Sequence, residues 1–401
     1  MTTITLDRYA DVRDAFRQHD LRQDMYDAGG LVMADCLLVL HGAEHRVRRR
    51  VENRLFRRGT FRHWEHSFLR DVVRDTLVPF VAAGRGDLVE IGYRTVMNLT
   101  AMVAGVDRPT GSDAEMIAAT DELYRFAKKF SEGATLVHTT RDPREVQAEV
   151  QAALDEFDAT FLQPSIARRQ ALLARFDAGE ITEDELPRDV LTALLRHRDE
   201  LGVDDDVIRR ECAFYLQAGS HSTANAFTHA AHDYFTWSAD RDASTDPALL
   251  QRCVYESLRL HPASPVAQRR ALAPIRLRGG TEIAEGTVVV MDLAGANRDA
   301  AVFDRPLEYD PLREVPDDVP RWGHAFGGGM HACIGTELAG GVPGPSTGTA
   351  GEGEQVLGTV TLMLGALLAA GGHPDPDGPA ERDPHSAREH FGRYPVAFPT
   401  S

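Results

Sequence analysis

The feature that most constrains this chain is a long helical segment near its middle. Residues 205–237 read DDVIRRECAFYLQAGSHSTANAFTHAAHDYFTW. At 1.5 Å per residue, a helix of this length extends about 50 Å, enough to cross a whole domain. Gly219 lies in its middle, where glycine costs about 1 kcal/mol relative to alanine. Close helix packing is one explanation for this glycine, and a functional role is the other.

Most of the first 260 residues are predicted to be helical, because apolar residues recur there at i, i+3 and i+4. Pro164 and a DAGEIT stretch interrupt the pattern. Besides 205–237, the predicted helices are Ala43–Leu55, Ala114–Phe130, Asp142–Phe176 and Pro187–His197.

After residue 262 the pattern changes. PIRLRGGTEIAEGTVVVMDLA contains two short β-rich runs, separated by Gly-Gly and Glu-Gly turns. Residues 340–354 are rich in Gly, Pro, Ser and Thr and are expected to form a flexible loop, with a helical pattern resuming at about Gln355. Without internal repeats or an interdomain linker, the sequence predicts one domain over 1–401, mainly α with a small β region.

The chain carries an excess of acidic residues, since 44 Lys and Arg against 61 Asp and Glu give a net charge of −17. A field of that sign disfavours nucleic acid as a partner. Hydrophobic residues make up 43% of the 401 and charged residues 26%. That balance supports a sizeable core and excludes a disordered chain or an integral membrane protein.

The cysteines and the apolar segments indicate the compartment. Four cysteines are too scattered for a disulfide framework or a zinc site. The N-terminus lacks the apolar core of a signal peptide, and the longest apolar stretch, 359–370, has about 12 residues where a membrane span needs about 20. We therefore expect a cytoplasmic protein that binds neither membrane nor nucleic acid.

The strongest chemical signal is FGGGMHACIG, residues 326–335. Its glycines let the backbone turn tightly and approach a flat ligand. A helix that starts just after Cys333 would favour the thiolate through its N-terminal dipole. A soft thiolate with no second protein ligand nearby suits one axial position on a heme iron. The alternative is a buried cysteine beside a glycine turn.

A second signal is VYESLRLHP, in which Glu256 and Arg259 lie three residues apart and therefore on one helical face. Alone it is weak, because such pairs are common and exposed ones contribute little. Its position strengthens it, since it falls about 75 residues before the cysteine loop and about 35 after Gly219.

In these features the chain resembles the bacterial, soluble type of cytochrome P450 over most of its length. Residues 326–335 match the heme-cysteine loop F-G-x-G-x-H-x-C-x-G completely. The loop follows, in order, an H-x-x-x-R element at His45 and Arg49, an A-G step at Ala218 and Gly219, and an E-x-x-R helix. The resemblance implies a triangular, α-rich prism in which heme b lies between the long distal helix and the cysteine loop.

The resemblance also implies roles for individual residues. Cys333 would bind the iron, in a loop framed by Phe326 and Gly335, while Ala218 and Gly219 would face the heme from the distal helix. Hydrogen-bonding histidines and arginines would hold the two negative propionates. These four residues are His45, Arg49, His331 and Arg269, the last placed just before the first β run.

Glu256 and Arg259 would be structural and lock the core beneath the heme. Family members often add an arginine from a later proline-rich segment. Here DRPLEYDPLRE has Glu308 at that point, so either Arg305 or Arg313 substitutes or the third member is absent.

The most informative departure lies over the iron, where the family usually has an acid followed by an alcohol that help deliver protons to dioxygen. Residues 218–223 read AGSHST, so the alcohol is Ser222, or Thr223 in a shifted register, and His221 replaces the acid. Three alternatives remain open: His221 shuttles protons near neutral pH, faces away from the pocket, or binds the iron and blocks the site.

Two surface features concern an electron donor. Residues 340–354 interrupt the helix after the cysteine, as a tolerated insertion or as a change in the docking face. Arginines gather on the helix of His45, where they would attract an acidic ferredoxin or flavoprotein, or else form a solvated face with internal ion pairs. They are Arg46, Arg48, Arg49, Arg50, Arg54, Arg57 and Arg58.

The resemblance implies a heme-thiolate monooxygenase. It would use O2 and electrons from an external ferredoxin and ferredoxin reductase, or a similar donor, to oxidise a small organic molecule, most often by hydroxylation, in secondary-metabolite biosynthesis. Residues 25–39, 123–161 and 214–223 would line a mainly apolar pocket, which names no substrate. A peroxygenase or oxidative coupling enzyme is the second interpretation, because of His221. A heme-binding module without turnover is the third.

Overall fold

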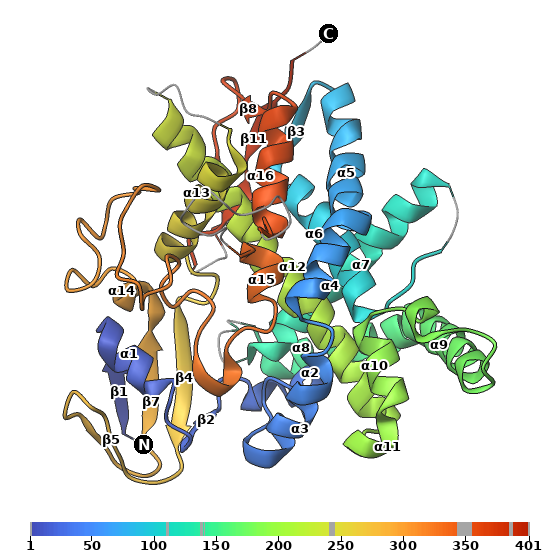
Figure 1. Ribbon diagram of the computed structural model, residues 1–401, viewed down its shortest axis with the longest axis horizontal. Helices are drawn as coiled ribbons and strands as arrows, with labels where there is room; N and C mark the ends of the chain where they lie inside the picture. The colour runs from blue at the N-terminus through green and yellow to red at the C-terminus, as the bar shows by residue number, and fades with distance from the viewer. Residues whose placement is uncertain are drawn as a thin grey trace. The chain divides into compact units, whose positions relative to one another are not determined.

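The computed structural model describes residues 2–109, 112–136, 139, 141–239, 245–342, 355–384 and 388–399. The chain forms two compact units: a first unit of residues 1–22, 58–95 and 222–401, and a second unit of residues 23–57 and 96–221. Helices dominate both units and the sheets are small (Figure 1). The predicted fold class, mainly α with a small β region, is therefore confirmed, while the single domain over 1–401 stays a prediction.

Two long helices contribute residues to both units. They are α6 (Leu88–Ala104) and α12 (Asp205–Ser238). The second confirms the helix predicted over 205–237, and it continues without a break through Gly219.

The remaining helices of the first unit lie within residues 9–15, 58–82 and 247–369. Its α13 begins where the sequence supplies a cap, because the Asp246 carboxylate accepts from the backbone N–H groups of Ala248 and Leu249. The helical elements are α1 (Tyr9–Ala15), α4 (Arg58–Trp64), the π-helical turn η2 (Glu65–Leu69), α5 (Arg70–Ala82), α13 (Pro247–Leu260), α14 (Leu293–Ala296), the 3-10 turn η6 (Gly329–His331), α15 (Thr336–Gly340) and α16 (Thr359–Ala369).

The main sheet of the first unit has the strand order β1-β7-β4-β2. Strand β7 (Val288–Asp292) pairs in parallel with β1 (Thr3–Leu6) and antiparallel with β4 (Val266–Ala271), and β2 (Leu21–Gln23) lies at the edge. Helix α1 packs its apolar side on this sheet, and Phe16 at the end of α1 belongs to the same core cluster.

The smaller sheets include a turn at the Gly-Gly pair where the sequence predicted one. Strand β5 (Ile275–Arg276) pairs antiparallel with β6 (Glu282–Ile283) around Gly280, whose φ is +92°. The remaining strands are β3 (Arg85–Asp87), β11 (Pro395–Ala397) and β8 (His373–Pro374), in one sheet, and β9 (Glu381–Arg382) and β10 (Phe391–Arg393), in another.

The second unit is helical, apart from the last residue of β2. Its α7 starts at a capping box in which Ser112 and Glu115 each satisfy the other's backbone N–H. Its elements are the 3-10 turn η1 (Asp27–Gly29), α2 (Gly30–Met33), α3 (Gly42–Glu52), α7 (Asp113–Ala134), α8 (Pro143–Phe157), the π-helical turn η4 (Asp158–Leu162), α9 (Gln163–Asp177), the 3-10 turn η5 (Glu183–Glu185), α10 (Val190–Arg196) and α11 (Arg198–Leu201).

Several boundaries differ from the sequence predictions. The helix over 142–176 contains the wide turn η4 just before Pro164, because proline has no N–H to donate and its ring crowds the preceding turn. The helix expected from Pro187 begins at Val190, since Asp189 caps it by accepting from the N–H of Thr192. Arg269 lies inside strand β4, not before the first β run.

The predicted loop over 340–354 falls largely outside the described residues, which stop at 342 and resume at 355. Its described ends are held together, because Val342 and Val356 form an antiparallel bridge. The next helix begins at Thr359 rather than at about Gln355, since Val356 is used in that bridge. Within the described part of the chain, no helix combines the length and apolarity needed to cross a membrane.

Candidate active site

The loop 326–335 lies in the first unit, where its backbone packs tightly on Phe16. A β-carbon at Gly328 would stand 2.9 Å from the Phe16 ring, and one at Gly329 would stand 1.8 Å from the Phe16 carbonyl oxygen. Gly327 and Gly329 have φ values of +66° and +63°, which glycine adopts readily. The glycines thus let the loop turn and lie close to the end of α1.

Cys333 is presented at the surface of this loop. Its backbone N–H donates to the Phe326 carbonyl at 2.9 Å, and its side chain is exposed. Helix α15 begins three residues later, as predicted, and the Thr336 hydroxyl donates to the Cys333 carbonyl at 2.8 Å. The alternative of a buried cysteine beside a glycine turn is therefore wrong.

The other three cysteines are buried and chemically different. Burial raises the pKa of the Cys36 and Cys212 thiols well above their usual value and that of Cys253 to about 11. A buried neutral thiol is inert and cannot meet a large ligand. Cys333 alone among the four can contact a group outside the protein core.

Arg269 approaches the same support as the cysteine loop. Its guanidinium carbon lies 5.9 Å from the Phe16 ring centroid, and the side chain is buried. Arg269 and the Cys333 loop thus lie against the same aromatic residue, although about 60 residues separate them in the chain. His331 is half-buried and ends η6 two residues before the cysteine.

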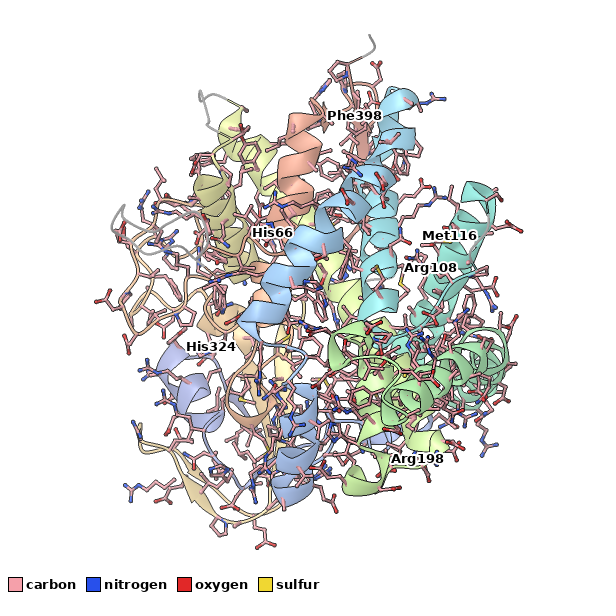
Figure 2. The ribbon with its side chains drawn as sticks, turned by 45° about the vertical axis from the view of Figure 1, so that its right-hand side comes forward. His66, Arg108, Met116, Arg198, His324 and Phe398 are labelled. Carbon is pink, nitrogen blue, oxygen red and sulfur yellow. The ribbon has the colours of Figure 1, made fainter. Side chains whose placement is uncertain are left out.

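A buried stack that the sequence did not reveal supports this region. The ring of His324, labelled in Figure 2, stacks on Tyr9 at 4.1 Å between centroids and lies 5.9 Å from Phe16. Burial lowers the pKa of His324 to about 4, so its imidazole is neutral. No sequence signal links these residues, because more than 300 positions separate Tyr9 from His324.

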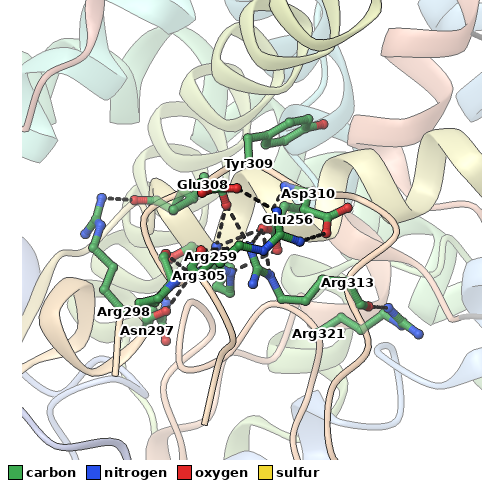
Figure 3. Close-up of polar contacts among 12 residues, drawn as sticks. Glu256, Arg259, Asn297, Arg298, Arg305, Glu308, Tyr309, Asp310, Arg313 and Arg321 are labelled. Carbon is green, nitrogen blue, oxygen red and sulfur yellow. Dashed lines mark hydrogen bonds and ion pairs between the residues drawn. The ribbon is translucent and has the colours of Figure 1, made fainter. Parts of the chain in front are cut away.

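The predicted pair Glu256–Arg259 forms a fully buried ion pair on α13 (Figure 3). Arg259 donates through Nε and Nη2 to the two carboxylate oxygens at 2.9 and 2.8 Å. Its Nη1 donates to the carbonyls of Asn297 and Pro306 at 2.7 and 2.8 Å. This bidentate geometry fixes α13 to the proline-rich segment that follows α14.

The third member of this cluster is Arg313. Its Nε donates to Glu256 Oε1 at 3.1 Å, its Nη2 donates to the Glu308 carbonyl at 2.8 Å, and its side chain is buried (Figure 3). Arg305 is exposed and pairs with the carboxylates of Asp304, Glu308 and Asp310 instead. Of the alternatives left open by the sequence, the structure thus selects Arg313.

On α12, the A-G step lies where the helix surface opens. Ala218 is exposed, and Gln217, Gly219, His221, Ser222 and Thr223 are half-buried, whereas residues 211–216 are all buried. Ala218 is thus an exposed residue between two buried runs of α12, residues 211–216 and 224–231.

Gly219 also has a packing role within the second unit. A β-carbon there would lie 2.5 Å from Thr100 Cγ2 of α6, so glycine lets the two helices approach. Close helix packing, one of the two explanations given for this glycine, is confirmed. His221, Ser222 and Thr223 are set on the same continuous helix, and the role of each stays a prediction.

His45 and Arg49 lie in the second unit, one turn apart on α3. Burial, and then the charges of Arg49 and nearby groups, lower the pKa of His45 to about 4. A neutral imidazole hydrogen-bonds without adding charge. Arg49 is half-buried and donates from Nε to Asn53 at 3.0 Å.

The arginine-rich surface expected on this helix is smaller than the sequence indicates. Arg48 is buried and pairs with Glu211 at 3.1 Å, so it points into the protein. Arg46, Arg50, Arg54 and Arg57 are exposed, and the side chain of Arg58 lies outside the part that the structure describes.

The residues of both units have the chemistry that a heme requires. The first unit offers an exposed thiol that would bind a heme iron, with a buried arginine near its loop. The second offers a neutral histidine and an arginine on α3 and an open helix surface at Ala218. Cations and hydrogen-bond donors of this kind suit two propionates.

Comparisons with known proteins agree with this chemistry. The family described as cytochrome P450 matches residues 240–340. "Putative cytochrome P450 YjiB" of Bacillus subtilis is 26% identical over 336 residues, which cover 82% of this chain and 76% of that protein. "Nocardicin C N-oxygenase" of Nocardia uniformis is 30% identical over 252 residues, covering 59% of this chain and 55% of that protein.

The fold agrees over nearly the whole chain. The crystal structure of CalO2 superposes with a TM-score of 0.74 at 19% identity, covering 99% of this chain and 91% of that one. At that identity the likeness concerns the fold alone, which the sequence motifs had indicated independently.

Proposed function

Because the chain belongs to the cytochrome P450 family, whose monooxygenases carry a heme-thiolate cofactor, we propose that Cys333 is the iron ligand of a heme b. We further propose that the enzyme hydroxylates a small organic molecule. The observation that carries this proposal is the exposure of Cys333 on a glycine loop, while the other three cysteines are buried.

The chain's own residues then have separate tasks. When bound, the heme supplies activation of dioxygen and transfer of one oxygen atom to the substrate. The positive Arg49 and Arg269 neutralise the propionates, while His331 and the neutral His45 donate hydrogen bonds to them. The buried pairing of Glu256 with Arg259 and Arg313 keeps the segment before the cysteine loop rigid.

Substrate and dioxygen would approach along α12 near the exposed Ala218. The Ser222 or Thr223 hydroxyl and the His221 imidazole are proposed to hold the protons that the reaction consumes, with His221 in place of the usual acid. An imidazole changes its protonation near neutral pH, which suits that task.

We propose that electrons come from an external ferredoxin with its reductase. Four exposed arginines on and after α3 favour an acidic donor, whose association would slow as salt rises. One matched relative is named for the oxidation of nocardicin C, which supports a place in secondary metabolism. The cytoplasm is the compartment in which we expect such partners.

The test measures whether an oxygen atom from O2 is incorporated into the product. Compounds that shift the Soret band of the ferric protein are selected as substrates and incubated with 18O2, NADPH and a surrogate ferredoxin pair. A product heavier by one 18O atom supports the proposal. Turnover that fails with every selected binder, while the electron donor is oxidised, would point to a heme-binding module instead.

The second candidate is an oxidative coupling enzyme or a peroxygenase, and the replacement of the distal acid by His221 favours it. The same experiment separates the two. A coupled product contains no 18O, and a peroxygenase forms an oxygenated product from hydrogen peroxide without any electron donor.

A further inference from the structure

A buried ionic ladder joins α3 to α12 within the second unit. Arg48 Nη1 donates to Glu211 Oε2 at 3.1 Å, and the Tyr215 hydroxyl donates to Glu52 Oε2 at 2.5 Å. Arg48 and Glu52 lie four residues apart on α3, as Glu211 and Tyr215 do on α12, so each helix contributes two side chains from one face. The two contacts fix the register of one helix against the other.

The charges of this ladder do not balance. Glu52 and Glu211 are both fully buried, and the buried cation Arg48 contacts Glu211. The backbone N–H of Leu37 also donates to Glu211, at 3.0 Å to Oε2. Two ionised carboxylates would therefore leave one uncompensated negative charge in the interior, which costs several kcal/mol.

Glu52 is the carboxyl better suited to keep a proton. Glu211 has the arginine and the amide of Leu37, both of which stabilise its charged form. Glu52 accepts a hydrogen bond from the Tyr215 hydroxyl, and its Oε1 has no hydrogen-bond partner among the described residues. Burial raises the pKa of Glu52 to about 7, and burial together with the Glu52 charge raises that of Glu211.

We propose that Glu52 keeps a proton in mildly acidic solution, at pH values where an exposed glutamate is already ionised, and that this proton lets the ladder act as a positioning device for α3, the helix that carries His45 and Arg49. The position of these two residues against the heme propionates rests on the proposed function. The proton itself does not, because it follows from the burial and charges of the ladder alone.

Alkaline pH opposes this arrangement. Once Glu52 ionises, it repels Glu211 across the ladder, and α3 is pushed away from α12. Other titratable or charged groups near the two carboxyls set the midpoint of the titration. They are Arg49 on α3, whose charge lowers the pKa of Glu52; Arg210, Cys212 and Tyr215 on α12; and Cys36 in the segment before α3.

The test measures heme release from the holoprotein into excess apomyoglobin between pH 6 and pH 9. We expect release to accelerate several-fold as pH rises through about 7, and we expect Glu52→Gln to remove this acceleration. Glutamine keeps an oxygen for the Tyr215 hydroxyl but cannot ionise. Glu44→Gln is the matched control, because Glu44 is an exposed glutamate on the same helix and should behave like the wild type.

A second readout does not depend on the heme. Infrared spectra at pH 6 should contain the carbonyl stretch of a protonated buried carboxyl, absent in Glu52→Gln and present in Glu44→Gln. Should Glu52→Gln fail to fold, Glu211→Gln serves, because the remaining carboxylate can then pair with Arg48 and no extra proton is needed. Equal pH profiles in wild type and both ladder variants, or no such infrared band, would overturn the proposal.

The two proposals fail in distinguishable ways. If the protein lacks a thiolate-bound heme but shows the infrared band, the proposed function is contradicted and the protonated ladder is supported. If the protein has a normal heme-thiolate spectrum but no infrared band, only the ladder proposal is contradicted.

Discussion

Two of the buried ionic clusters among the described residues have opposite surpluses of charge. In the first unit, Glu256 contacts two arginines, Arg259 and Arg313. In the second, Arg48 contacts one of two buried glutamates, Glu52 and Glu211. Arginine cannot release a proton in the accessible pH range, so the N–H groups of an excess arginine must be paired with hydrogen-bond acceptors. A carboxylate surplus can instead be removed by binding a proton.

The contacts follow this distinction. The N–H groups of Arg259 and Arg313 that do not reach Glu256 donate instead to backbone carbonyls. These carbonyls belong to Asn297, Pro306 and Glu308. Glu52 accepts from the Tyr215 hydroxyl, and its Oε1 has no hydrogen-bond partner among the described residues. The arginine-rich cluster should therefore be insensitive to pH, and the glutamate-rich ladder should respond to it. The following predictions test that contrast.

The largest effect is expected from Arg259→Leu. It leaves Glu256 with one arginine and strands several buried carbonyls, so the free energy of unfolding should fall by about 3–5 kcal/mol. Urea unfolding of the holoprotein measures this loss. Arg305→Leu, in an exposed arginine of the same region, should cost less than about 1 kcal/mol. Equal losses in the two variants would show that burial of the Arg259 cluster contributes little.

The next effect is a pH dependence of stability that arises in the ladder. The folded-state pKa of Glu52 is raised from 4.5 to about 7, so folding retains a proton that the unfolded chain releases. This contribution is complete below pH 4.5 and is lost as pH rises to about 7. The loss amounts to about 3 kcal/mol.

Unfolding free energies of the wild type and Glu52→Gln, compared at each pH, isolate this contribution from other titrating groups. The difference between the two curves should change by about one bound proton between pH 5 and pH 7. A constant difference would mean that Glu52 is already ionised in the folded protein.

Arg313→Lys should have a smaller effect that does not vary with pH. An ammonium group cannot reproduce the planar fork that reaches both Glu256 and the Glu308 carbonyl, so we expect a loss of about 2 kcal/mol. Arg305→Lys, at an exposed position, is the control and should be nearly silent. Thermal unfolding at pH 6 and pH 8 tests both parts of this expectation.

The smallest effect is expected from Tyr215→Phe, at about 1 kcal/mol. The hydrogen bond from Tyr215 lowers the pKa of Glu52, so its removal should move the titration of Glu52 to higher pH. An infrared titration of the protonated carboxyl band locates the midpoint. A midpoint that moves down instead would place the proton elsewhere in the ladder.

Local sequence patterns predicted much of the fold and site. The helix over 205–237, the hairpin turns, the pairing of Glu256 with Arg259 and the helix after Cys333 all depend on residues close in the chain. The sequence could not predict features that depend on distant neighbours. The charged spacing on α3 gave no sign that Arg48 turns inward, because Glu211 lies 163 residues away.

The same reason explains the strand that contains Arg269. VAQRRA has little apolar alternation, and it forms β4 because β7 supplies its partner. Phe16 and His324 likewise support the cysteine loop through contacts that cross most of the chain.

The central claim is that Cys333 holds a heme iron as a thiolate. The most direct measurement is the absorption spectrum of the purified protein, first ferric and then reduced by dithionite under carbon monoxide, for the wild type, Cys333→Ala and Cys253→Ala. The account predicts a strongly red-shifted Soret band in the reduced carbon monoxide complex of the wild type and Cys253→Ala, and its loss in Cys333→Ala. A band typical of histidine-ligated heme in the wild type, or an unchanged spectrum in Cys333→Ala, would contradict it.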